Sequence, residues 1–289
     1  MKKINYCGTI IIIGKPNVGK STIINKLVKS KVSIVSKRPH TTQSNIIGIQ
    51  NDRSIQAIYT DTPGISRKYK EFINKKQYSH IKKLCNSSEL ILLVLNQTHW
   101  TLDDELVLQI IKNNITPTIA VINKNDKILH KISLLPHIEF LRKKYSFQEI
   151  IPISGKTGDN IDLLSNIVQK ILPMSAPRFP FNQITNNSLH FQISEIIREK
   201  FIFYLGNELS HSIKIIIESV NLKKRVYIIK GIIIVKNNSH KKIIIGYQGQ
   251  KIKLCGTIAR QELEKYLQNS VYLSLFVKNT KKYSANLYI

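Results

Sequence analysis

The first 173 residues alternate between short apolar runs and longer amphipathic stretches. Each run is mostly apolar, which predicts strands buried on both faces of a parallel sheet. The stretches between the runs place apolar side chains three or four positions apart, as helices that pack on a sheet do. Strands are expected at 9–13, 46–49, 55–60, 90–95, 117–122 and 149–153, and helices at 22–28, 68–85, 103–113 and 160–171. This order predicts a doubly wound, mostly parallel α/β domain.

A different pattern follows a segment that contains prolines and has little apolar periodicity. The chain beyond it predicts a helix, two strands, two helices and a last strand, within 189–205, 212–220, 226–236, 242–267 and 271–278. We therefore divide the chain into a domain of residues 1–173, a linker of 174–188 and a smaller α+β domain of 189–289.

The stretch between the first strand and the first helix has a clear chemical meaning. It reads Gly-Lys-Pro-Asn-Val-Gly-Lys-Ser and fills every fixed position of the phosphate-binding motif G-x-x-x-x-G-K-[ST]. In such a loop the backbone N–H groups face the phosphates, Lys20 adds a cation and the Ser21 hydroxyl ligates Mg²⁺. Lys20 is also a candidate catalytic residue. The candidate nucleotide-binding residues here are Gly14, Lys15, Pro16, Asn17, Val18, Gly19, Lys20, Ser21 and Thr22.

Further oxygen ligands for Mg²⁺ are expected near this loop. The strand at 55–60 ends in Asp61-Thr62-Pro63-Gly64, where the acid can associate with the metal and Gly64 lets a backbone N–H approach the γ-phosphate. The polar segment 32–43 has no helical or strand period and predicts a switch loop. Thr42, favoured over its neighbour Thr41, is a candidate ligand and catalytic residue in that loop. The predicted metal ligands are Ser21, Thr42 and Asp61.

Two later loops each follow a strand and predict recognition of the base. Asn123-Lys124-Asn125-Asp126 selects guanine, because an aspartate carboxylate can accept from both the ring N–H and the exocyclic amine. This motif favours GTP over ATP. Ser154-Gly155-Lys156 fits a second loop in contact with the base. The candidate residues are Asn123, Lys124, Asp126, Ser154, Gly155 and Lys156.

The C-terminal domain contains Ile-Ile-Gly-Tyr-Gln-Gly between two predicted helices. This arrangement resembles the KH module, whose Gly-x-x-Gly loop lets an RNA backbone pass close between two helices. The alternative is a small α+β dimerisation domain. The resemblance implies RNA contacts from Gly246, Tyr247, Gln248, Gly249, Lys251 and Lys253.

Composition adds modest support for an RNA partner. The net charge is +26, and basic proteins gain affinity for phosphate backbones by releasing counterions. Lysine far outnumbers arginine, however, as in chains biased towards A/T-rich codons. Cys7, Cys85 and Cys255 are scattered and odd in number, which predicts reduced thiols in the cytoplasm. The apolar runs fall far short of the roughly 18 residues that suggest a membrane span.

Taken together, the nucleotide motifs and the KH-like domain resemble Era-type GTPases over the whole chain. The resemblance implies Mg²⁺-dependent hydrolysis of GTP to GDP and binding of small-subunit (16S) ribosomal RNA near its 3′ end, with no DNA partner. It also implies a role in assembly and maturation of the 30S ribosomal subunit. The implied location is the cytoplasm, with peripheral association at the inner face of the cell membrane. This chain departs from the family pattern at Gly155, where Ala is usual, and at Tyr247-Gln248, which lacks the usual Lys.

The residues leave the group that assists hydrolysis open. Ile65 stands where many GTPases have a water-orienting Gln, and an aliphatic side chain cannot hydrogen-bond the attacking water. Arg38 in the switch loop is one alternative. Related GTPases with Asn at the position of Asn17 hold K⁺, so the resemblance implies a second cation and a catalytic role for Asn17. The other explanation is that Asn17 only stabilises the turn.

Two other classes of function stay open at this point. A metabolic P-loop ATPase or nucleotide kinase would lack the Asn-Lys-x-Asp motif and would not explain the C-terminal domain. A non-catalytic RNA-binding scaffold that only senses GTP would release no phosphate.

Overall fold

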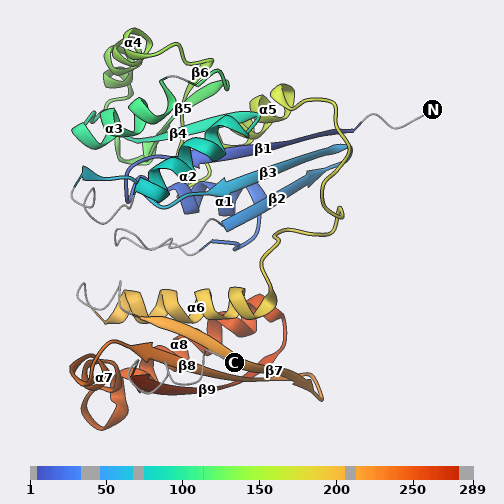
Figure 1. The fold of residues 1–289 in the computed structure, drawn as a ribbon, viewed down its shortest axis with the longest axis vertical. Coiled ribbons are helices and arrows are strands. Elements are labelled where there is room, and N and C mark those ends of the chain that lie inside the picture. Colours follow the sequence, from blue (N-terminus) through green and yellow to red (C-terminus); the bar gives the residue numbers. More distant parts are fainter. Residues whose placement is uncertain (1–4, 34–45, 68–74, 113, 206–212, 280–289) are drawn as a thin grey trace. The chain divides into compact units, whose positions relative to one another are not determined.

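The computed structural model describes residues 5–33, 46–67, 75–112, 114–205 and 213–279. The chain divides into two compact units, residues 1–186 and 187–289 (Figure 1). Each unit contains its own sheet and its own hydrophobic core.

The first unit is built on a six-stranded sheet with the order β2-β3-β1-β4-β5-β6. Strand β2 runs antiparallel to β3, and the other pairs are parallel. The carboxyl ends of the parallel strands therefore meet at one edge, which is where loops of α/β proteins bind ligands. The strands are β1 (Tyr6–Ile13), β2 (Ile46–Asp52), β3 (Ile55–Asp61), β4 (Leu90–Asn96), β5 (Thr118–Asn123) and β6 (Glu149–Pro152).

Helices cover both faces of this sheet, and this explains why its strands are apolar runs. In β1, Ile10 and Ile12 belong to one core cluster while Ile11 and Ile13 belong to the other. Helices α1 and α5 contribute to the first cluster, and α2, α3 and α4 to the second. The predicted doubly wound α/β fold is confirmed. The helices are α1 (Lys20–Val28), α2 (Lys75–Asn86), α3 (Leu102–Ile111), α4 (Leu134–Lys144) and α5 (Ile161–Ile171).

The second unit packs its helices on one face of a three-stranded sheet with the order β7-β8-β9. Strand β8 pairs antiparallel with β7 and parallel with β9. The helix-strand-strand-helix-helix-strand order is the one that the sequence predicts. The elements are α6 (Leu189–Tyr204), β7 (Lys214–Lys223), β8 (Val226–Val235), α7 (Asn238–Ile245), α8 (Gln250–Leu267) and β9 (Ser270–Asn279).

Two features of the first unit differ from the sequence predictions or extend them. Helix α4 was not predicted, although Leu134, His137 and Leu141 are buried at helical spacing. The strands β2 and β3 reach further towards each other than expected, so the predicted turn at 50–54 shortens to Arg53 and Ser54. Among the described residues, no helix is long and apolar enough to cross a membrane.

Residues 174–186, which the sequence analysis assigns to a linker, pack on the first unit. The fully buried side chain of Gln56 in β3 accepts hydrogen bonds from the backbone N–H groups of Arg178 and Phe179, at 2.8 and 3.0 Å, and donates to the Phe179 carbonyl at 2.8 Å. The Ile49 N–H of β2 donates to the Ile184 carbonyl at 2.8 Å. This segment therefore continues along the sheet before α6 begins.

Candidate nucleotide-binding site

The phosphate loop joins the end of β1 to the start of α1. Its lysine is buried, and its Nζ donates to the Gly14 carbonyl at 3.1 Å and to the Lys15 carbonyl at 3.0 Å. Burial lowers the pKa of Lys20 to about 8, and the nearby Asp61 carboxylate opposes that shift. The structure thus places a single ammonium group against the loop, where the sequence predicts contact with phosphates.

Two glycines allow neighbouring loops to approach the phosphate loop. A Cβ on Gly19 would lie 2.3 Å from the Asn123 side-chain nitrogen, and the residue has φ +101°. A Cβ on Gly64 would lie 2.7 Å from both the Cα and the nitrogen of Pro16. Because real Cβ atoms do not come this close to backbone, the loop after β3 can contact the phosphate loop only with glycine at this position.

Oxygen atoms suited to Mg²⁺ meet between α1 and β3. The Ser21 hydroxyl donates to Oδ2 of the buried Asp61 at 2.6 Å, and the Ser33 hydroxyl donates to the same oxygen at 2.8 Å. A hydroxyl beside a carboxylate is a donor set that hard cations prefer, so these residues fit the predicted metal. Sequence reasoning missed Ser33, which lies in the segment predicted as a switch loop. Thr41 and Thr42 lie outside the described residues.

Asn123 holds the base-reading loops to the phosphate loop. Its Nδ2 donates to the Val18 carbonyl at 2.7 Å, and its Oδ1 accepts from the backbone N–H groups of Lys124 and Gly155 at 2.8 and 2.9 Å. The Lys124 ammonium donates to the Asn17 carbonyl at 2.7 Å. Three motifs that lie far apart in the sequence therefore form one structural unit.

The predicted base-reading carboxylate is exposed and oriented by a neighbour. Asp126 Oδ1 accepts from the Ser154 hydroxyl at 2.6 Å, and the same hydroxyl oxygen accepts from the Thr157 N–H at 3.1 Å. Lys156 is exposed in the same loop. A Cβ on Gly155 would lie 3.3 Å from Ile23 Cγ1, so the missing methyl group leaves slight extra space beside α1.

Helix α3 supports the phosphate loop through a contact that the sequence did not reveal. Lys15 Nζ lies 2.7 Å from Oδ2 of Asp104, which is almost completely buried, and 3.1 Å from the Thr101 hydroxyl. Burial is the main cause that lowers the pKa of the nearby His137, with the Asp104 charge opposing it. Thr101 and Asp104 form a capping box, whose spacing is readable in the sequence. Its partner Lys15 is not.

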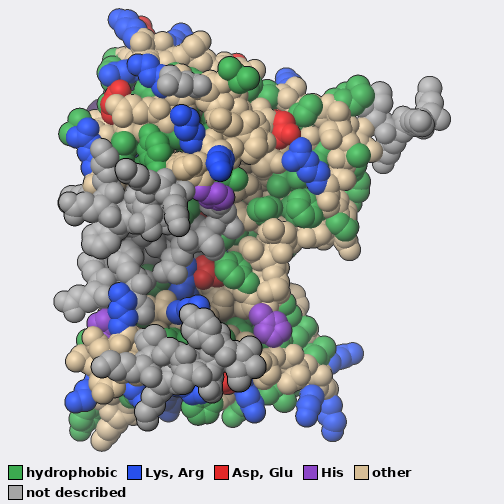
Figure 2. Space-filling view, in the orientation of Figure 1, with side chains coloured by type: hydrophobic (Ala, Val, Ile, Leu, Met, Phe, Trp, Pro, Cys, Tyr) green, Lys and Arg blue, Asp and Glu red, His purple; other side chains and the backbone are tan. Residues whose placement is uncertain are grey.

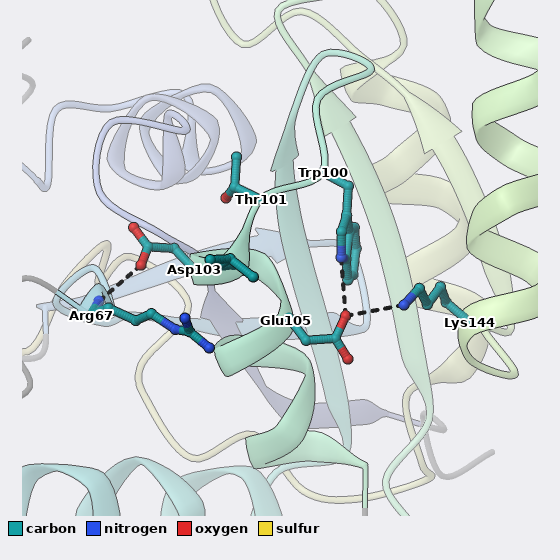
Figure 3. Close-up of a pocket in the computed structure, with 7 residues that line it drawn as sticks. Arg67, Trp100, Thr101, Asp103, Glu105 and Lys144 are labelled. Atoms are coloured by element: carbon teal, nitrogen blue, oxygen red, sulfur yellow. Dashed lines mark hydrogen bonds and ion pairs between the residues drawn. The ribbon is translucent and has the colours of Figure 1, made fainter.

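The first turn of α3 also holds the chain after Gly64. Asp103 accepts from the Ser66 hydroxyl at 3.0 Å and from the Arg67 N–H at 2.8 Å. Beside these contacts lies a pocket of about 700 Å³, in which Glu105 bonds the Trp100 indole and pairs with Lys144 (Figure 3). Of the residues predicted for the nucleotide site, none lines this pocket, so it is separate from the phosphate loop.

The Gly-x-x-Gly loop of the second unit turns sharply between α7 and α8. Gly246 has φ +72° and Gly249 has φ +78°, which favour glycine, and Gln248 between them has φ +45°. Tyr247 is 77% exposed. Lys251 and Lys253, which the sequence predicts as RNA contacts, are exposed in the first turn of α8.

The comparisons with protein families match each unit. A family model described as "50S ribosome-binding GTPase" matches residues 9–124, and a KH domain model matches residues 208–282. The chain is 53% identical to GTPase Era of Buchnera aphidicola subsp. Baizongia pistaciae (strain Bp), over 98% of this chain and 99% of that protein. It is 42% identical to GTPase Era of Yersinia pestis (strain Pestoides F), over 94% and 90%.

Two solved structures resemble the whole chain. Era of Aquifex aeolicus bound to GDP and AlF4⁻ has a TM-score of 0.89 and 39% identity, and covers 95% of this chain and 94% of its own. Era in complex with MgGDPNP and nucleotides 1506–1542 of 16S ribosomal RNA has a TM-score of 0.89 and 38% identity, with the same coverage.

Proposed function

We propose, for a chain that belongs to the Era family of GTPases, that GTP hydrolysis controls its binding to 16S ribosomal RNA near the 3′ end and thereby assists assembly and maturation of the 30S subunit. The observation that carries this proposal is the joining of the phosphate and guanine loops through Asn123, in a chain that also presents Gly-x-x-Gly. A related Era bound to a 16S fragment supports the RNA partner.

The described residues divide the work at the nucleotide. Lys20 and the backbone of the phosphate loop bind the phosphates, while Asp126, held by Ser154, accepts from guanine. We assign Mg²⁺ to Ser21 and Asp61, with Thr42 as a further ligand, and when bound it neutralises charge on the phosphates. These assignments are supported by a related Era that contains MgGDPNP.

Asn17 is the proposed site of a K⁺ that assists hydrolysis. Ile65 is buried in the core, so its side chain does not reach the attacking water. Asn17 is exposed on the phosphate loop, and its carboxamide supplies an oxygen of the kind that cations prefer. Its φ of +63° also fits the alternative, in which Asn17 only stabilises the turn.

Comparison of K⁺ with Na⁺ at matched ionic strength separates these two roles. We expect the parent to hydrolyse GTP faster in K⁺ and the Asn17→Ala variant to lose that difference. Asn17→Gly keeps the left-handed backbone and removes the carboxamide, so it should also lose the difference if the oxygen matters. Equal rates of the parent in both salts would reject the cation.

The second unit supplies the proposed RNA contacts through Gly246, Tyr247, Gln248, Gly249, Lys251 and Lys253. Glycines at both ends of the loop let a backbone approach closely, and the lysines supply positive charge. We place this activity in the cytoplasm, with peripheral association at the inner face of the membrane as a further proposal from the family resemblance.

Release of phosphate from the purified full chain tests the proposed function. GTP and ATP are compared as substrates, with and without a single-stranded RNA that copies the 3′ end of 16S ribosomal RNA. We expect hydrolysis of GTP alone, with a rate or nucleotide affinity that changes when the RNA is bound. RNA binding that is the same with GDP and a non-hydrolysable GTP analogue would contradict the coupling.

A further inference from the structure

The outer face of the β7-β8-β9 sheet carries exposed aromatic rings. In edge strand β9, Tyr272 is 63% and Phe276 is 57% exposed. The residues that alternate with them pack into the core beneath the helices, so these two rings stand on the opposite face of the sheet. The core-facing residues of β9 are Val271, Leu273, Leu275 and Val277.

Lysines interleave with these rings across the sheet. The strand register places Ile228 opposite Tyr272, Lys230 opposite Ser274 and Ile232 opposite Phe276. Lys230 therefore lies in the row between the two aromatic rows. A further row places Lys214 and Lys278 on either side of Ile234, and all three lysines are exposed. Apolar and basic side chains thus alternate on this outer face.

The charge of this sheet is strongly one-sided. Residues 214–235 and 270–279 contain six basic residues and one acid, Glu218, a net charge of +5. Lys and Arg side chains are visible where the β7–β8 turn projects (Figure 2). An anionic partner is therefore favoured. The basic residues are Lys214, Lys223, Lys224, Arg225, Lys230 and Lys278.

We propose that this outer face, centred on Tyr272, Phe276 and Lys230, is a second binding surface for single-stranded RNA. It rests on the proposed RNA-binding function and extends it to the face of the sheet opposite α7 and α8, the helices that flank Gly-x-x-Gly. Unpaired bases stack on exposed rings whatever their sequence, and lysines beside them neutralise phosphates. Sheets that present aromatic side chains bind single-stranded RNA in this manner.

Single-stranded RNA fits this face better than an anionic membrane does. Membrane-surface elements bury a continuous apolar face between the lipid headgroups. Here Ser274 separates the two rings along β9, and Lys230 lies next to Ser274 on β8. Separate stacking platforms with charge between them suit bases and phosphates.

RNAs of two lengths test this surface. A short single strand of about four nucleotides fills a Gly-x-x-Gly groove, whereas one of roughly 16 nucleotides can also reach a second surface. In the full chain we expect Tyr272→Ala or Phe276→Ala to weaken binding of the longer RNA roughly five-fold or more and to leave the short RNA unaffected. Phe203→Ala is the matched control, because Phe203 on α6 is 60% exposed but lies outside this face.

Further variants separate stacking from loss of folding. Tyr272→Phe keeps the ring and should bind the longer RNA like the parent. Lys230→Gln should make the salt dependence of the longer RNA shallower by about one unit of log–log slope. If the two alanine variants bind the longer RNA as tightly as the parent does, the second surface is rejected.

Two controls distinguish this failure from others. If the parent binds neither RNA, the proposed function itself fails. If the parent binds both RNAs and Lys251→Ala weakens both equally while the β9 variants change nothing, the Gly-x-x-Gly site stands without the second surface. Loss of binding to phosphatidylserine-containing vesicles by the β9 variants, with unchanged RNA binding, would overturn the proposal in favour of a membrane contact.

Discussion

Single side chains at this site serve more than one loop, so the effect of a substitution depends on which contacts it removes. Asp126 is useful for a test because its Oδ1 is held by Ser154 and the residue is exposed. Asp126→Asn replaces one acceptor with a donor and should shift preference from guanine to xanthine nucleotides. We expect GTP affinity to fall by at least about tenfold, since a site built for paired hydrogen bonds discriminates strongly.

Titration calorimetry with GTP and XTP measures this shift. Asp159→Asn is the control, because Asp159 is a nearby carboxylate that accepts from Asn125 and is not predicted to read the base. Unchanged GTP affinity in Asp126→Asn would show that another group selects guanine.

The pKa of Lys20 predicts how nucleotide binding depends on pH. Burial lowers the pKa of this amine to about 8 in the ligand-free loop, so the amine loses its proton above that pH. Contact with phosphates favours the charged form, so nucleotide binding above about pH 8 must take up a proton. Affinity should therefore fall by up to about tenfold per pH unit from about pH 8 to 9.5.

Calorimetry in two buffers that differ in ionisation enthalpy counts the protons. We expect uptake that approaches one proton near pH 9.5 and is absent from this lysine near pH 6.5, where it is charged in both states. Lys20→Arg stays charged, so whatever binding remains should be flat over this range. A flat profile for the parent would mean that Lys20 keeps its proton in the free loop.

The limits of sequence reasoning at this scale follow from distance along the chain. The phosphate and guanine loops could be predicted because fixed spacings specify their chemistry. The contact of Lys15 with Asp104, and of Ser33 with Asp61, could not, because each pair depends on how separate elements pack. Asp104 alone indicates only a helix cap.

Two glycines at and near the start of helix α8 should respond oppositely to the same substitution. Gly256 lies inside the helix, and a Cβ there would meet only Leu275 Cδ1, at 4.0 Å. Gly256→Ala should therefore stabilise the second unit by about 0.5–1 kcal/mol. Gly249 caps the same helix at φ +78°, so Gly249→Ala should destabilise it by a similar amount.

Hydrogen exchange of the α8 amides measures both changes within the full chain. This readout is preferable to one melting temperature, because a chain of two compact units need not unfold in a single step. Slower exchange in both variants would show that the left-handed conformation of Gly249 is not needed.

Element predictions succeeded where periodicity was strong. The buried strands β1 and β4 and the order of elements in the second unit follow the apolar pattern directly. Helix α4 was missed because its polar residues outnumber its buried ones. The packing of residues 177–179 on the sheet was hidden because it depends on one buried amide, that of Gln56, whose partners lie more than a hundred residues away.

At the scale of the whole molecule, salt dependence distinguishes RNA contacts from general basicity. Lys251→Ala should weaken RNA binding and make the log–log salt slope shallower by about one unit if its ammonium contacts a phosphate. Lys265→Ala is the control, because Lys265 lies in the last turn of the same helix, far from Gly-x-x-Gly. Filter binding over a range of KCl concentrations measures both. Equal affinity and slope for Lys251→Ala and the parent would leave Lys251 as a solvated side chain only.

The attachment of residues 174–186 to the first sheet shortens the tether between the two units. Ile184 is hydrogen-bonded to β2, and the Ser188 hydroxyl already caps α6. The free span is therefore a few residues, each adding at most about 3.6 Å of reach. A ligand held by one unit then meets the other at an effective concentration in the millimolar range, as short connections give. An RNA long enough to touch both units would thus bind through one molecular collision followed by an intramolecular step, and its dissociation would require both contacts to open together.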